Sequence, residues 1–212
     1  MAPGLNNVDV VLAHGLWMPG IVMTPLAARL ARAGYRCHVF QYASHRRPLE
    51  WNMERLARFV GRRLEGRPAH YVGHSLGGLV ILGMLAAHAS FPVGAVVLLG
   101  TPARGCLSAR LVGRRGLGRW LLGASEPQWR EGMQARWQRP EPLGVIAGTA
   151  RFGLTSALVR LPGQNDGAVR VEETVVEGMR ARIVLPVAHS AMIVSQRVAA
   201  QVLAFLREGR FS

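Results

Sequence analysis

The stretch AHYVGHSLGGL, residues 69–79, decides how the rest of the chain is interpreted. It contains Gly73-His74-Ser75-Leu76-Gly77, a G-x-S-x-G pattern between a short apolar run and a long run rich in glycine, alanine and leucine. A strand, a tight turn and a helix in this order are the context in which the pattern forms a nucleophile elbow. The glycines leave room for the strand and the helix to pass close to the serine. We therefore expect Ser75 at the apex of a strained turn.

Length and cysteine usage favour one globular domain. The chain has 212 residues, half of them apolar, which is enough for one α/β domain with a sizeable core. Cys37 and Cys106 lie far apart and form no motif, which argues against a disulfide scaffold or a zinc site and fits a reducing compartment. Neither a leader pattern nor an apolar run of membrane-spanning length is found, so we expect a cytoplasmic protein.

The net charge of +14 comes from 26 basic residues, all of them arginine. A positive charge of this size favours binding to nucleic acid or to an anionic membrane surface. The arginines are spread along the chain, however, and neither a nucleic-acid motif nor a repeated basic and aromatic platform accompanies them. We interpret the charge mainly as a compositional preference for arginine. No nucleic-acid partner is expected, while peripheral contact with an anionic membrane stays open.

Apolar runs and helical periodicities alternate along the chain. Strands are predicted at 8–13, 35–42, 70–72, 93–99, 143–149 and 182–187. Helices are predicted at 20–34, 51–65 and 76–90 and after Ser190, a residue that can cap the last helix. This alternation predicts an α/β fold, a three-layer sandwich with a mostly parallel sheet of about six strands and helices on both faces.

Residues 103–141 differ from the rest. They hold eight arginines and three of the five tryptophans, Trp120, Trp129 and Trp137, and their periodicity is broken. We interpret this stretch as a short cap inserted into a single domain spanning 1–212. Solvated arginines and tryptophans that line a substrate pocket are the favoured interpretation, ahead of a docking surface.

The candidate base follows by elimination. A serine nucleophile needs a base, and in this elbow fold the chain order is serine, acid, histidine. Of seven histidines only His88 and His189 follow Ser75. His88 is expected about 20 Å from the serine, at the far end of the next helix. His189 comes directly after the last predicted strand, where active sites of open α/β sheets gather. His189 is therefore the predicted base.

The candidate acid is Asp166. The chain has two aspartates, and Asp9 precedes the serine, whereas Asp166 lies in a Gln-Asn-Asp-Gly loop between Ser75 and His189. Glu172 and Glu173 follow that loop and remain as alternatives. The acid would hold one nitrogen of His189 and stabilise the imidazolium.

An oxyanion hole needs two backbone N–H donors. Leu76 follows the serine and would give one, and the loop His14-Gly15-Leu16-Trp17 would give the other through Leu16. The predicted substrate contacts are His14, Gly15, Trp17 and His74. For His14 and His74 a packing role is the alternative.

These motifs together resemble the α/β-hydrolase superfamily. The resemblance is carried by HGLW at 14–17, GHSLGG at 73–78, LGTPARG at 99–105, NDGAV at 165–169 and His189. It is strongest with the lipase and esterase branch, including the small bacterial lipases and the inositol-deacylase-like group. The resemblance implies a triad of Ser75, Asp166 and His189, oxyanion donors at Leu16 and Leu76, and no cofactor. The cap is brief and rich in arginine, whereas lipase lids usually present an apolar face.

The predicted function is hydrolysis of carboxylic esters through an acyl-enzyme, with a small-molecule ester or a lipid as substrate. A thioesterase, acyltransferase or amidase on the same scaffold is the alternative, since fold does not decide chemistry. A non-catalytic binding protein that uses the basic surface is the third hypothesis. The sequence does not distinguish acyl groups or oligomeric states.

Overall fold

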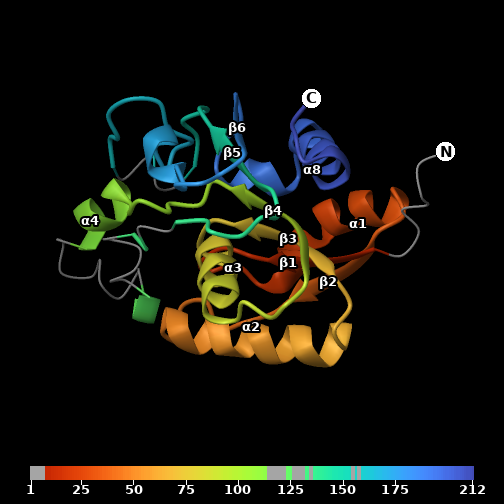
Figure 1. Ribbon diagram of the computed structural model, residues 1–212. Coiled ribbons are helices and arrows are strands. Elements are labelled where there is room, and N and C mark those ends of the chain that lie inside the picture. The colour runs from red at the N-terminus through yellow and green to blue at the C-terminus, as the bar shows by residue number, and fades with distance from the viewer. Residues whose placement is uncertain (1–7, 114–122, 126–131, 134–135, 154–155, 157–158) are drawn as a thin grey trace.

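A six-stranded parallel sheet forms the centre of the molecule (Figure 1). The computed structural model describes residues 8–113, 123–125, 132–133, 136–153, 156 and 159–212. Within them every strand pair is parallel, in the order β2-β1-β3-β4-β5-β6. The strands are β1 (Asp9–Ala13), β2 (Arg36–Phe40), β3 (Ala69–His74), β4 (Val93–Leu99), β5 (Leu143–Gly148) and β6 (Ala181–Leu185). The predicted α/β sandwich with a parallel sheet of six strands is confirmed, and β2 and β6 form its edges.

Helices cover both faces of the sheet (Figure 1). Side chains alternate across a strand, so Val11 packs on one face with α2 (Leu49–Leu64) and α3 (Leu76–Ala87). Val10 packs on the other face with α1 (Thr24–Arg32) and α8 (Gln196–Glu208). Both faces of the central strands are buried, which explains why their sequences are continuous apolar runs.

The helices differ in how much of their surface is buried. The first ten residues of α3 are all buried, because its sequence LGGLVILGML carries no polar side chain. Helices α1, α2 and α8 each bury one apolar stripe of side chains.

Short 3-10 turns form several of the connections between these elements. They are η1 (Gly20–Met23), η2 (Gly123–Ser125), η3 (Val171–Thr174) and η4 (Ser190–Ile193).

The expected cap of the last helix is wrong. Ser190 begins the 3-10 turn η4 rather than α8, and the hydroxyl of Ser195 accepts the N–H of Val198 at 3.3 Å. The turn is inserted between the two elements, so the capping site moves five positions along the chain. Gly209, with φ 66°, ends α8.

The order of the strands in the sheet explains why the predicted site lies at the carboxyl ends of β1 and β3. From β1 the chain goes to one edge through β2 and then returns to the other side of β1 through β3. The carboxyl ends of β1 and β3 therefore flank a topological switch point, the place where open α/β sheets hold their ligands. The loop beginning at His14 follows β1, and Ser75 follows β3.

The insertion is described only in part. Its first described helix is α4 (Leu107–Gly113). Trp120 and Trp129 lie outside the described residues. Trp137 is buried in the core cluster of α3 and donates its indole N–H to the carbonyl of Glu141 at 2.7 Å. It is absent from the described lining of the cleft that contains Ser75 and lines a separate cavity of about 460 Å³ beside α3, so the expected place at the substrate pocket is not met at Ser75.

We expect burial of His70 to make the fold sensitive to acid. Its ring lies on β3 against Gly94 and meets Tyr35 edge to face, with 5.8 Å between centroids. Burial lowers the pKa of His70 to about 4, from 6.5. Between these values the unfolded chain binds a proton that the folded chain does not, so stability falls as the pH drops. We expect a loss of about 2 kcal/mol from this group between pH 7 and pH 5.

Urea unfolding of the wild type and of His70→Gln at both pH values measures this loss. The variant should lose less stability on acidification than the wild type. Equal losses in the two proteins would show that His70 is not responsible.

Candidate active site

Ser75 lies at a strained turn between β3 and α3. Its φ of 53° and ψ of −121° are unusual for a residue with a side chain, and the residue is 2% exposed. A Cβ added to Gly73 would lie 2.5 Å from the Cα of Gly78, and one added to Gly77 would collide with the carbonyl oxygen of Ala13. The glycines of the motif are thus required by close backbone approach, and the predicted strand–turn–helix context is present.

His189 and Asp166 form a hydrogen-bonded pair. Nδ1 of His189 lies 2.7 Å from Oδ2 of Asp166, and the N–H of His189 donates to the carbonyl of Asp166 at 2.9 Å. A carboxylate only accepts, so in the neutral ring Nδ1 carries the hydrogen and Nε2 is the free base. The loop after β5 and the loop after β6 bring the two residues together.

Backbone donors hold the other carboxylate oxygen. Oδ1 of Asp166 accepts the N–H groups of Val169 at 2.7 Å and Ala168 at 3.0 Å. Burial by itself raises the pKa of Asp166, but the charge and hydrogen bond of His189 and the two backbone N–H groups outweigh it and lower the pKa below 3.8. Asp166 is therefore a carboxylate at neutral pH, although it is 1% exposed.

The two alternative acids lie elsewhere. Glu172 is exposed and pairs with Arg170 at 2.5 Å. Glu173 is 4% exposed and accepts the N–H of Leu107 at 2.7 Å and that of Arg170 at 2.8 Å. Its carboxylate is thus used to join backbone segments, and the structure pairs His189 with Asp166 instead.

Ser75 and His189 line one cleft of about 270 Å³. Of the predicted substrate contacts, the cleft contains Gly15, Trp17 and His74, together with Leu16. Six further residues that sequence reasoning missed complete the described lining: Met18, Cys106, Ser108, Ala168, Val169 and Ser190. Asp166 itself lies behind His189.

The predicted oxyanion donors flank Ser75. Leu76 begins α3, so its N–H has no acceptor within the helix. Leu16 lies in the loop after β1, next to Trp17, whose φ of 58° marks a sharp turn. A Cβ on Gly15 would lie 3.3 Å from the Cβ of Ser75, so the glycine lets this loop approach the serine closely.

His14 supports this loop from behind. It is fully buried and is absent from the described cleft lining, so direct substrate contact by its side chain, as predicted, does not fit its position. The hydroxyl of Tyr42 donates to the carbonyl of His14 at 2.6 Å, and the two rings stack with 4.3 Å between centroids. The alternative of a packing role describes His14 better.

His74 joins the serine turn to the histidine loop. Its Nε2 lies 3.0 Å from the carbonyl oxygen of His189, and because a carbonyl accepts, Nε2 carries the hydrogen. Burial lowers the pKa of His74 to about 3, so its ring is neutral across the physiological range. Its Nδ1 is buried without a partner.

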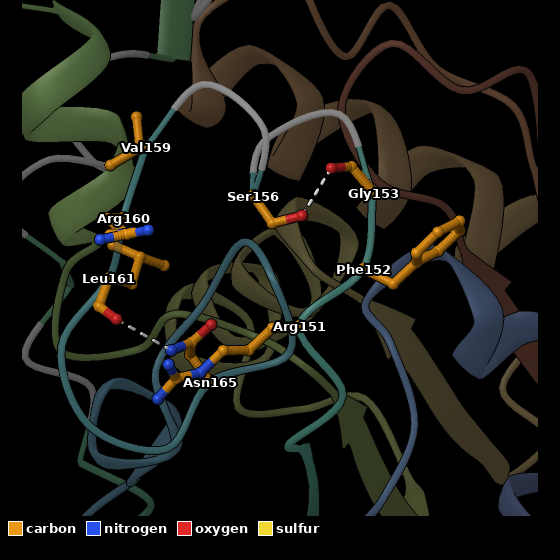
Figure 2. A pocket seen from close by; sticks show the side chains of 8 residues that line it. All are labelled: Arg151, Phe152, Gly153, Ser156, Val159, Arg160, Leu161 and Asn165. Atoms are coloured by element: carbon orange, nitrogen blue, oxygen red, sulfur yellow. Dashed lines mark hydrogen bonds between the residues drawn. The ribbon is translucent and has the colours of Figure 1, made fainter.

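A larger cavity of about 730 Å³ lies within the loop that follows β5 (Figure 2). Arg151, Arg160 and Asn165 are among its lining residues, and Figure 2 shows the ring of Phe152 directed away from Leu161. The described lining contains neither Ser75 nor His189. The smaller cleft is therefore the candidate active site, despite its size.

Comparison with known proteins places this geometry in a family. The chain matches the sequence pattern of the alpha/beta hydrolase family over residues 10–204. It belongs to the alpha/beta hydrolase family. No curated protein matched this hydrolase-family chain.

Solved structures share the alpha/beta hydrolase fold. The mature lipase BlEst2 of Bacillus licheniformis has a TM-score of 0.80 and 18% identity, covering 99% of this chain and 94% of that one. A hydrolase from Pseudomonas aeruginosa has a TM-score of 0.70 and 18% identity, covering 94% and 90%. An esterase from Thermogutta terrifontis has a TM-score of 0.68 and 13% identity, covering 97% and 91%. At these identities the likeness concerns the fold.

Across the described part of this alpha/beta hydrolase, no three histidine, cysteine or acidic side chains are grouped as metal ligands. None of the helices seen there combines the length and the apolar character needed to cross a bilayer.

Proposed function

We propose that this alpha/beta hydrolase cleaves carboxylic esters, with Ser75 as nucleophile, His189 as base and Asp166 as the acid that orients it. One observation carries the proposal: His189, hydrogen-bonded to a buried carboxylate, shares a cleft with a serine held at a strained strand-to-helix turn. A serine hydroxyl is a weak nucleophile unless a base removes its proton. The pair supplies that base and fixes its tautomer.

The reaction follows from these roles. Nε2 of His189 takes the proton of Ser75 as the oxygen attacks the ester carbonyl, and the N–H groups of Leu16 and Leu76 bind the oxyanion. His189 then gives its proton to the leaving alcohol, and an acyl-enzyme forms. Water, activated by the same ring, releases the acid and restores Ser75.

The cleft favours short acyl groups. Its volume of about 270 Å³ lies below the range of about 300–1,000 Å³ that is usual for drug-sized ligands. The rim includes the half-exposed Trp17, whose ring contacts His45 at 3.7 Å between centroids. A short acyl chain fits such a space, whereas a long chain would extend past the rim.

We expect kcat/KM on p-nitrophenyl butyrate to exceed that on the laurate ester by about tenfold or more, because the additional methylenes find no pocket. Rates on a series from acetate to laurate, below micelle concentration and with Ser75→Ala as background, measure the preference. A rate that rises steadily up to laurate would contradict the short-chain assignment.

Turnover of a thioester with the same acyl group distinguishes an esterase from the main alternative, a thioesterase. The same acyl-enzyme forms from a thioester, so the two substrates differ only in the leaving group. Butyryl thioester turnover well above that of the oxygen ester would replace the esterase proposal with a thioesterase. Mass analysis of Ser75 after treatment with a serine-reactive phosphonate tests the nucleophile independently of substrate.

A further inference from the structure

The start of the insertion is tied to the loop that carries Asp166. The N–H of Arg104 donates to the carbonyl of Glu173 at 3.0 Å, and the N–H of Leu107 donates to the Glu173 carboxylate at 2.7 Å. The same carboxylate accepts the N–H of Arg170 at 2.8 Å. Glu173 thereby fixes the beginning of α4 relative to the turn that follows Asp166.

Ser108, the second residue of α4, makes a closer contact with that loop. Its hydroxyl donates to the carbonyl oxygen of Ala168 at 2.6 Å, and its side chain is almost fully buried. The Sγ of Cys106 lies 3.0 Å from the same hydroxyl oxygen. The hydroxyl hydrogen is directed to Ala168, and the thiol lies 3.6 Å from the same carbonyl oxygen, within reach to donate to it as well.

The hydrogen bond from Ser108 to Ala168 is linked to the Asp166–His189 pair through one peptide group. The carbonyl of Ala168 and the N–H of Val169 belong to the same peptide, and that N–H donates to Oδ1 of Asp166 at 2.7 Å. The opposite oxygen, Oδ2, lies 2.7 Å from Nδ1 of His189. A continuous path therefore runs from Ser108 through the peptide and Asp166 to His189.

We propose that Ser108 is a positioning residue for Asp166, acting through the peptide group that joins Ala168 to Val169. The proposal rests on the proposed triad. A donor on the carbonyl oxygen polarises the peptide and strengthens its N–H as a donor, and it also fixes the plane of that peptide. The carboxylate is then held in line with His189. The beginning of the insertion thus supports the acid.

Ser108 also lines the cleft, so direct contact with substrate is the competing role. A double-mutant cycle separates the two, because groups that act as a unit are not additive. If Ser108 acts through Asp166, its removal matters only while the carboxylate is present. If it contacts substrate, its removal matters in either background.

The experiment compares Ser108→Ala with the wild type and repeats the change on Asp166→Asn. The second-order rate at which a small phosphonate labels Ser75 is measured with kcat and KM on p-nitrophenyl butyrate. We expect a loss of about tenfold in labelling rate and kcat with little change in KM, since one hydrogen bond is removed. On Asp166→Asn the same change should cost less than about twofold.

Three further variants control for structure. Ser108→Thr keeps the hydroxyl and should recover most of the rate. Thr174→Val removes a hydroxyl that donates to the carbonyl of Val171 at 2.7 Å, a bond of similar length in the neighbouring turn that does not lead to Asp166. It should lower the melting temperature but leave the labelling rate near that of the wild type. If Ser108→Ala does not fold, Ser108→Cys, a weaker donor of similar shape, should give a smaller loss of the same kind.

The outcomes are distinct. Equal losses from Ser108→Ala in both backgrounds, or no loss in either, would overturn the positioning role. If the wild type is labelled at Ser75 but hydrolyses no ester, the proposed reaction fails while the labelling rates still decide the role of Ser108. A wild type that the phosphonate does not label would overturn both.

Discussion

Ser75→Ala is expected to lower kcat for ester hydrolysis on the order of 10⁶-fold, the scale found when the nucleophile of a well-studied triad is removed. The physical reason is that, of the three serines in the described lining of the cleft, Ser75 is the one at the strained strand-to-helix turn, so its loss removes the covalent step. The measurement is kcat on p-nitrophenyl butyrate, with the mass of the phosphonate adduct followed in parallel. The variant should form no adduct.

Ser44→Ala provides a matched control. Ser44 is also buried, at 5% exposed, but it is absent from the described lining of the cleft. Its replacement should leave kcat within a few-fold of the wild type. Retention of ester hydrolysis in Ser75→Ala, with circular dichroism showing both variants folded, would refute Ser75 as the nucleophile.

Asp166→Asn is expected to lower kcat by about 10⁴-fold while the protein stays folded. Two backbone N–H groups face Oδ1, so the amide oxygen must take that position and the amide NH₂ must face His189. The NH₂ group is a donor, which forces Nδ1 of His189 to accept and moves the ring hydrogen to Nε2. A ring protonated at Nε2 cannot take the proton of Ser75.

Glu172→Gln tests the assignment with a carboxylate from the same loop. Glu172 has 70% of its side chain exposed and pairs with Arg170. Its neutralisation should leave kcat close to that of the wild type. A large loss from Glu172→Gln together with a small one from Asp166→Asn would move the acid to the glutamate.

Much of the fold follows from local patterns. Continuous apolar runs predicted the buried strands, and their alternation with helical stripes predicted a parallel sheet with two covered faces. The start of α8 shifted from the residue after Ser190 to Gln196, because caps depend on turns that periodicity does not encode. Ser195 rather than Ser190 caps α8 for this reason.

The candidate site was predictable where chain order and strand ends restrict the choice. Ser75, Asp166 and His189 each follow a different strand, and carboxyl ends of parallel strands meet at one edge. The role of His14 was not predictable, because the same loop can direct a side chain into the cleft or behind it. The contacts of His14 with Tyr42, two residues beyond β2, distinguish the two.

The sequence by itself determined the elbow and the order of its partners, because the glycines, the strand ends and the chain order are all local or sequential features. Only the tertiary structure decided what holds the acid. Ser108 and Ala168 are 60 positions apart, and their hydrogen bond exists because Glu173 fixes the start of the insertion against the loop after β5. Neither residue type nor spacing carries that information, since a serine donates to any carbonyl that packing brings within reach.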